Sequence, residues 1–148
     1  SSTRERRAEG GESLRVPSSP QTRKKMDQEE VWVELVKGMR EKSLDQGEVL
    51  VQAGATGSPL VCVQSGLLVL LDRTGLEVMR LEPGGLLGPV ELMVTGVSLV
   101  TAKALLPTVV LELETQDLVP ALCRSEVLYP NLQALAYKRY EDWERRGV

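Results

Sequence analysis

The chain has 148 residues, of which 42% are hydrophobic and 26% charged, a composition that fits one folded domain with its own core. Aromatic residues make up 3% and phenylalanine is absent, so the core has to be built mainly from leucine and valine. Histidine is absent as well, which excludes serine-protease triads, imidazole general bases and imidazole metal ligands. The composition therefore argues against most classes of enzyme, and we expect no catalytic residue.

The net charge of −3 is distributed unevenly along the chain. Residues 1–25 contain seven Lys/Arg against three Asp/Glu, a net charge of +4. Residues 26–148 contain eleven Lys/Arg against eighteen Asp/Glu, a net charge of −7. Because acidic surfaces repel the phosphate backbone, we expect no nucleic-acid partner for the second part.

Membrane insertion and metal binding have little support in the sequence. There is no apolar run long enough to cross a bilayer and no signal-peptide pattern, so we expect no membrane insertion by this segment. Cys62 and Cys123 lie in apolar stretches, as free buried thiols do, and a single disulfide is the alternative. The free-thiol interpretation indicates a reducing, intracellular and cytoplasmic location. Two cysteines without histidine make a zinc site improbable.

The first predicted segment, residues 1–25, is rich in Ser, Arg, Gly, Glu and Pro. It cannot bury enough apolar surface to offset its ordering entropy, which predicts a disordered basic linker or tail. A targeting or docking arm is the alternative interpretation of its positive charge. The folded domain is then expected over residues 26–148.

A helix is predicted over residues 27–42. Val31, Leu35 and Met39 recur at four-residue spacing and give one apolar stripe, and Asp27 can cap the start. Short Val- and Leu-rich segments follow, most of them ended by Gly or Pro at a spacing of about ten residues, which is typical of an antiparallel barrel or jelly roll. The predicted strands are 49–51, 60–63, 67–71, 76–81, 102–106 and 109–113, with a hairpin turn at residues 72–75.

The end of the chain again has helical patterns. Thr115 is predicted to cap a helix over residues 116–122, in which Pro120 is awkward beyond the first turn. Pro130 suits the first turn of a last helix that begins at Tyr129. One face of this helix is apolar and can serve as a lid, as a surface for a protein partner, or as packing on the barrel. That face consists of Leu132, Leu135, Ala136, Arg139, Tyr140 and Trp143, and Trp143, near an exposed chain end, is the first candidate for a partner contact.

A glycine-rich turn at residues 84–88 leads into a short helical pattern. Backbone N–H groups of such a turn, together with a helix N-terminus, favour anions. The order of elements and the motifs around this turn resemble the cyclic nucleotide-binding domain, over roughly residues 28–145. The motifs are Gly47-Glu48-Val49-Leu50 with Gly54, Val61-Cys62-Val63-Gln64-Ser65-Gly66-Leu67, Glu82-Pro83-Gly84-Gly85-Leu86-Leu87-Gly88, Thr101-Ala102-Lys103-Ala104 and Tyr129-Pro130-Asn131-Leu132.

The resemblance implies a mainly β fold: an antiparallel β-roll of the jelly-roll or cupin-like type with one N-terminal and two C-terminal helices. It also implies a phosphate-binding cassette over residues 87–104, in which a Glu binds the ribose 2′-OH and an Arg pairs with the cyclic phosphate. Pro89 stands at that Glu position and Ser98 at that Arg position, and Glu91 replaces a small residue. The candidate pocket residues are Leu87, Gly88, Pro89, Val90, Glu91, Leu92, Ser98 and Leu99.

These departures predict a degenerate cassette. Pro89 removes a backbone N–H, Glu91 adds negative charge if it points inward, and Ser98 lacks the charge that pairs with phosphate. Ser98 can still donate a weak hydrogen bond to a ligand, or it satisfies its own backbone. We therefore expect no cofactor and no binding of cAMP or cGMP in the usual way.

The leading hypothesis is a regulatory or interaction module that contacts a protein partner or other domains of a longer chain. A genuine cyclic-nucleotide or small-ligand sensor that moves its last helix is the alternative. An enzyme on a cupin-like roll lacks the necessary metal ligands. A transcription-factor role is not supported, since no helix-turn-helix pattern follows the last strand.

Overall fold

The computed structural model describes residues 33, 35 and 37–148 of the chain. Residues 1–25, predicted to be a linker, and the start of the helix predicted over 27–42 lie outside the described residues. Val33, Leu35 and Lys37 are helical, and the Gly38 amide donates to the Leu35 carbonyl at 3.0 Å. The predicted helix is wrong at its C-terminal end, because a strand already begins at Arg40.

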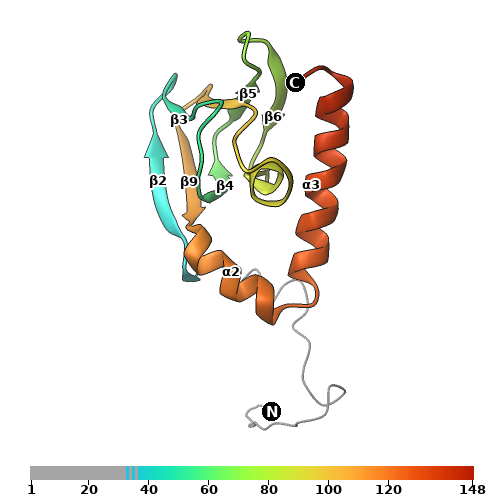
Figure 1. Cartoon of the computed structure of the whole chain (residues 1–148). Coiled ribbons are helices and arrows are strands. Elements are labelled where there is room, and N and C mark those ends of the chain that lie inside the picture. Colours follow the sequence, from blue (N-terminus) through green and yellow to red (C-terminus); the bar gives the residue numbers. More distant parts are fainter. Residues whose placement is uncertain (1–32, 34, 36) are drawn as a thin grey trace, which may run out of the picture.

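Eight antiparallel strands in the described part form two four-stranded sheets (Figure 1). The strand order is β2-β9-β4-β7 in the first sheet and β3-β8-β5-β6 in the second. The predicted antiparallel β-roll is therefore confirmed. The bounds are β2 Arg40–Leu44, β3 Val49–Val51, β4 Leu60–Ser65, β5 Leu68–Leu71, β6 Glu77–Leu81, β7 Leu86–Leu87, β8 Thr101–Ala104 and β9 Thr108–Leu113.

The two strands that the pattern missed both lie at sheet edges. In β2, four of the five residues are exposed, and the strand pairs with β9 from Arg40 opposite Glu112 to Leu44 opposite Thr108. An exposed edge strand needs no alternation of apolar residues, and charged side chains there discourage pairing with other chains. Strand β7 has two residues and is fixed by pairing with β4 rather than by its own sequence pattern.

The predicted turn between β5 and β6 has an internal hydrogen-bond network. The Asp72 carboxylate accepts hydrogen bonds from the Thr74 amide at 2.8 Å, the Thr74 hydroxyl at 2.6 Å and the Leu76 amide at 3.0 Å. These bonds, with the Thr74 hydroxyl contributing most, lower the pKa of Asp72. Because Asp side chains readily close such turns, the hairpin is set locally.

The core lies between the two sheets and is built from Val, Leu and Ala, as the absence of phenylalanine requires. Its buried members come from the inward positions of the strands and from Trp143 near the C-terminus. A second cluster joins the first helix, two strands of the first sheet and both C-terminal helices. It consists of Leu35, Leu60, Leu113, Leu118 and Leu128.

Helix α2 spans Thr115–Arg124 and helix α3 spans Leu128–Arg145. The predicted capping role of Thr115 is wrong, because Thr115 is already helical and Glu114 is the cap residue, without a side-chain cap bond. Pro120 lies inside α2, where it cannot donate to the carbonyl of Gln116; both residues are exposed, so water can satisfy that carbonyl. No helix in the described part of the chain is long and apolar enough to span a membrane.

The start of α3 is fixed by Ser125, a buried residue whose role the sequence did not indicate. Its hydroxyl oxygen accepts hydrogen bonds from the amides of Val127 at 3.2 Å and Leu128 at 2.9 Å. Pro130 lies in the first turn of α3, as predicted. In Figure 1 α2 runs below the sheets and α3 stands along one side of the roll.

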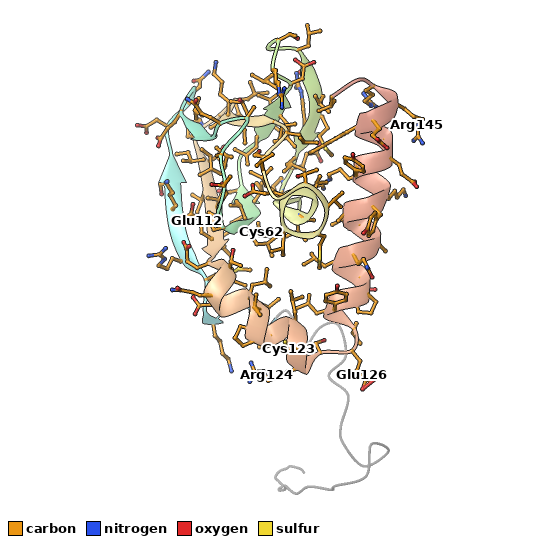
Figure 2. All side chains as sticks on the ribbon, viewed as in Figure 1. Cys62, Glu112, Cys123, Arg124, Glu126 and Arg145 are labelled. Atoms are coloured by element: carbon orange, nitrogen blue, oxygen red, sulfur yellow. The ribbon has the colours of Figure 1, made fainter. Side chains whose placement is uncertain are left out.

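The two cysteines are free thiols in different parts of the domain. Cys62 is half-buried on β4, and burial raises the pKa of its thiol. Cys123 is exposed near the end of α2, so the expectation that both thiols are buried is wrong for Cys123 (Figure 2). An amphipathic helix carries Cys123 on its outer side, which an apolar local sequence does not reveal.

We expect Gly66→Ala to destabilise the domain by about 2–4 kcal/mol in urea unfolding. Gly66 has φ of +92°, and a Cβ there would lie 2.7 Å from the Pro107 carbonyl oxygen, so backbone strain and a clash add together. Gly75 is the matched control: its φ is +90° but no atom lies within 4 Å of an added Cβ. Gly75→Ala should cost about 1–2 kcal/mol. Equal losses for the two variants would contradict the close approach.

Candidate functional site

The glycine-rich turn is held against the centre of the first sheet. The Gly84 amide donates to the Val63 carbonyl at 2.8 Å, and the Val63 amide donates to the Gly85 carbonyl at 3.0 Å. Strand β7 continues this pairing, with Leu86 opposite Cys62. These bonds to β4 fix the position at which the cassette begins.

A short helix follows the turn, as predicted, but its hydrogen bonding is that of a π-helix. Helix η1 spans Glu91–Thr95, and the Gly96 amide closes it by donating to the Glu91 carbonyl at 2.9 Å. Gly88 before the helix and Gly96 after it both have positive φ, of +116° and +77°. Single π turns are often found at functional sites.

A small cavity lies between η1, the second sheet and α3. Its volume is about 20 Å³, which is room for one water molecule. Eleven residues line it: Val51, Ser58, Pro59, Leu87, Gly88, Val90, Glu91, Ser98, Leu99, Val100 and Trp143. The cassette and the last helix thus meet at one place, which we call the cassette pocket.

Six of the eight predicted pocket residues line the cassette pocket, whereas Pro89 and Leu92 do not. Pro89 is fully buried, and Leu92 packs against the second hydrophobic cluster. The sequence analysis did not name four further lining residues: Val51, Ser58 and Pro59, which come from other segments, and Val100, which follows Leu99 in the cassette. Ser58 and Pro59 lie in an irregular loop before β4 that has no recognisable pattern.

Trp143 closes the cassette pocket from α3. Only 3% of its surface is exposed, and it belongs to the main core cluster. Leu132 and Ala136 of the same helical face are also buried, and Leu135 and Tyr140 are partly buried. This face therefore packs on the roll, which is one of the three alternatives that the sequence left open, and the buried Trp143 takes part in that packing.

Glu91 points toward the cassette pocket and has one polar partner. Its carboxylate accepts a hydrogen bond from the Ser58 amide at 3.1 Å. Burial raises the pKa of Glu91, and the bond from Ser58 only partly offsets this effect. Among the described residues that line the pocket, Glu91 is the only one with an ionisable side chain.

Ser98 is buried and satisfies its own backbone. Its hydroxyl donates to the Val100 carbonyl at 2.7 Å and lies 3.4 Å from the Val100 amide. The Ser98 amide and carbonyl bond to Ala55 and Gly54 of the neighbouring loop, at 2.9 and 2.7 Å. The position at which the resemblance requires a phosphate-binding Arg is thus occupied by a side chain engaged in a local turn.

Arg139 lies on the same face of α3 as Trp143, four residues earlier in the sequence. Its guanidinium donates to the Leu86 carbonyl of β7 at 2.5 Å, and burial lowers its pKa. It is not among the residues that line the cassette pocket. Within the described residues, no group of three or more Cys, Asp or Glu side chains is arranged to hold a metal ion.

These observations define an antiparallel β-roll with a small, mostly apolar pocket that contains one carboxylate. The model of the cyclic nucleotide-binding domain family matches residues 41–125, which is more than half of the chain. The chain therefore belongs to the cyclic nucleotide-binding domain family, whose domains are regulatory rather than catalytic. No curated protein shows significant similarity to the sequence.

Several solved structures share the fold of this chain. The catabolite activator protein of Thermus thermophilus is 24% identical with a TM-score of 0.68, over 79% of this chain and 57% of that protein. The N-terminal domain of a transcriptional regulator from Streptomyces coelicolor is 26% identical with a TM-score of 0.55, over 82% and 84%. A cAMP-bound PfPKA-R structure is 18% identical with a TM-score of 0.62, over 75% and 38%. This chain thus spans little more than half the length of the Thermus protein.

We expect Glu91→Gln to make the domain more stable at neutral pH but not at acidic pH. A raised pKa means that Glu91 binds a proton more tightly in the folded state than in the unfolded state. The free energy of unfolding of the natural protein therefore falls as pH rises from the ordinary Glu pKa of about 4.3, which applies to the unfolded chain, toward the higher pKa of the folded state. Gln keeps an oxygen for the Ser58 amide and has no charge to desolvate. Urea unfolding at several pH values checks this, and a difference independent of pH would contradict it.

Proposed function

We propose that this domain is a non-catalytic regulatory or interaction module that does not bind cAMP or cGMP in the usual way and needs no cofactor. It acts in the cytoplasm through contacts with a protein partner or with other domains of a longer chain. The observation that carries the proposal is the cassette pocket, which has one carboxylate, no cation and a tryptophan closing it.

Electrostatics argue against a cyclic phosphate in this pocket. A buried phosphate needs a cationic partner, and a missing partner for a buried charge costs about 3–5 kcal/mol. Ser98 cannot supply that charge and its hydroxyl is engaged with Val100. Glu91 lies in the same pocket and would repel the phosphate whenever it is ionised.

The size of the pocket leads to the same conclusion. Pockets for small organic ligands have volumes of about 300–1,000 Å³, whereas the cassette pocket has about 20 Å³. A nucleotide would have to displace Trp143, which is buried in the core. Burial of an aromatic side chain of this size stabilises a fold by about 3 kcal/mol, and the ligand would have to replace that contribution.

The C-terminal helices provide surface for a partner. Tyr129 and Tyr137 of α3 and Val119 of α2 are 45–47% exposed. Tyrosine is enriched among residues that anchor protein interfaces. The names of two similar structures, a catabolite activator protein and a transcriptional regulator, describe regulatory proteins, which supports a regulatory role for this domain.

We expect a titration of the 15N-labelled chain with up to millimolar cAMP or cGMP to leave the amide signals of Gly88, Glu91 and Ser98 unchanged. The reason is the lack of a cation in the pocket. Saturable shifts at these residues and along α3 would overturn the proposal and establish a nucleotide sensor that works without the usual Glu and Arg.

The variant Trp143→Ala separates the two physical reasons for this expectation. It removes the indole and leaves the charges of the pocket unchanged, so we expect the titration to remain silent. Nucleotide binding by this variant alone would mean that space, rather than charge, excludes the nucleotide. Amide signals of the paired strands β4 and β9 verify that the variant is folded.

We also expect the double variant Tyr129→Ser, Tyr137→Ser to lose proteins that the natural domain captures from a cell extract. The two exposed rings lie on the outer surface of α3, so folding stability should change by less than about 0.5 kcal/mol. Leu76→Ser is the matched control, because Leu76 is even more exposed but lies at the β5–β6 hairpin. Equal loss for both variants would exclude α3 as the specific surface.

A further inference from the structure

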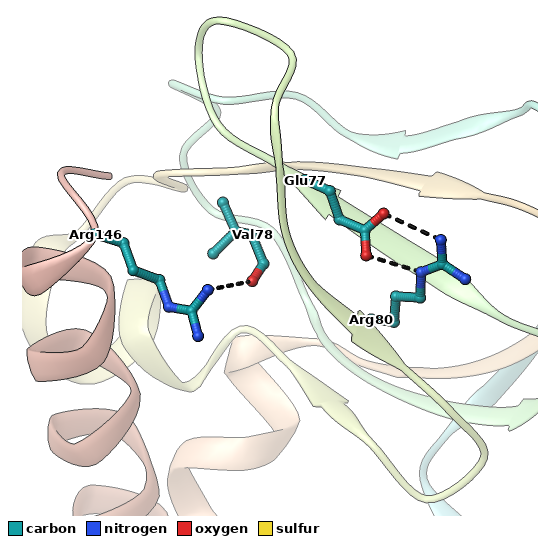
Figure 3. Close-up of polar contacts among 4 residues, drawn as sticks. All are labelled: Glu77, Val78, Arg80 and Arg146. Atoms are coloured by element: carbon teal, nitrogen blue, oxygen red, sulfur yellow. Dashed lines mark hydrogen bonds and ion pairs between the residues drawn. The ribbon is translucent and has the colours of Figure 1, made fainter.

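Helix α3 reaches the edges of both sheets through two arginines. Arg139 donates to the carbonyl of Leu86 in β7, which is an edge strand of the first sheet. Arg146, directly after the helix, donates through Nη1 to the carbonyl of Val78 at 3.4 Å (Figure 3). Val78 lies in β6, an edge strand of the second sheet.

The spacing of these side chains places them on one side of α3. Arg139 and Arg146 are seven residues apart, which is two helical turns, and Trp143 lies between them. Trp143 is buried in the core and lines the cassette pocket. After the helix, the Val148 amide donates to the Trp143 carbonyl at 3.0 Å, and Val148 packs against the same core.

We propose that α3 is a lid held closed by contacts within the chain, which we call the latch. Arg139 and Arg146 bind carbonyls in edge strands of the two sheets, and Trp143 closes the cassette pocket. The closed arrangement then needs no ligand. Opening the lid would free two edge-strand carbonyls and uncover the pocket in one movement. This inference concerns the closure of α3 and holds whether or not the pocket accepts a nucleotide.

The contacts of the two arginines differ in strength. Arg139 is half-buried, and within the described residues its only polar partner is the Leu86 carbonyl, so loss of this bond leaves a desolvated cation. Arg146 is more exposed, its bond to Val78 is long, and it also pairs with Asp142 at 2.9 Å. Exposed ion pairs contribute little to stability, so the bond from Arg139 should contribute more than the contacts of Arg146 to holding α3 closed.

Hydrogen–deuterium exchange of the full chain tests the latch. We expect Arg139→Gln to speed exchange of amides in residues 132–148 by about tenfold, as the loss of one charge-assisted hydrogen bond implies. Arg146→Gln should speed exchange of the same amides by about two- to threefold, and the double variant should speed it more than either single variant does. Exchange in β4, β5 and β9 should not change, because the strands and cassette of the roll supply every buried member of the main core cluster except Trp143.

Arg145→Gln is the matched control, since it removes the same charge from the same helix. Arg145 is highly exposed and pairs with Asp142 at 3.5 Å. It should leave exchange unchanged, and an effect equal to that of Arg139→Gln would overturn the latch in favour of a general charge effect. Asp142→Asn removes the ion pair of Arg146 but not its bond to Val78, so it should have a smaller effect than Arg146→Gln.

The result that overturns the proposal is unchanged exchange of α3 in the double variant Arg139→Gln, Arg146→Gln. If Arg139→Gln also loosens the roll, Arg139→Lys replaces it, because Lys keeps the charge and one donor. Arg139→Lys should then speed exchange in residues 132–148 only, by less than the double variant does. Exchange that rises equally in α3 and β9 in this variant would show a structural role for Arg139 rather than a latch.

Discussion

The burial of the Trp143 indole between α3 and the cassette is the contact on which the rest of the site depends. Among the buried residues that the structure describes in this core, it is the only aromatic one, and the others are Val, Leu and Ala. It brings the last helix of the chain against the segment that the family uses for its ligand. The hydrophobic effect thereby closes the pocket, a task that in a liganded domain would be shared with the bound molecule.

Most of the fold could be predicted because its signals are local. Strands β3, β4, β5, β6, β8 and β9 have Val- and Leu-rich segments, most of them ended by Gly or Pro, and the Asp72 turn closes through its own side chain. Strand β2 was mistaken for the end of a helix because its polar residues lack alternation. Pairing with β9 decides its structure, and such a long-range contact leaves no pattern in the strand itself.

The cassette pocket was predicted less completely than the fold. Six lining residues could be named because they lie in the one stretch of sequence that resembles the family's cassette: Leu87, Gly88, Val90, Glu91, Ser98 and Leu99. Val51 of β3 and Ser58 and Pro59 of a loop lie far from the cassette in the sequence, and tertiary packing alone brings them to the site. For Trp143 the sequence left a lid, a partner contact and packing on the barrel open, and its burial shows that packing on the roll is one of its roles.

The π turn of η1 has a consequence for the length of the cassette. A bond from the Gly96 amide to the Glu91 carbonyl encloses one residue more than an α-helical turn does. Gly88 and Gly96 on either side tolerate positive φ and can absorb the change in chain direction. One residue can therefore be lost or gained within η1 while β7 and β8 keep their registers, so cassettes of different length fit the same frame.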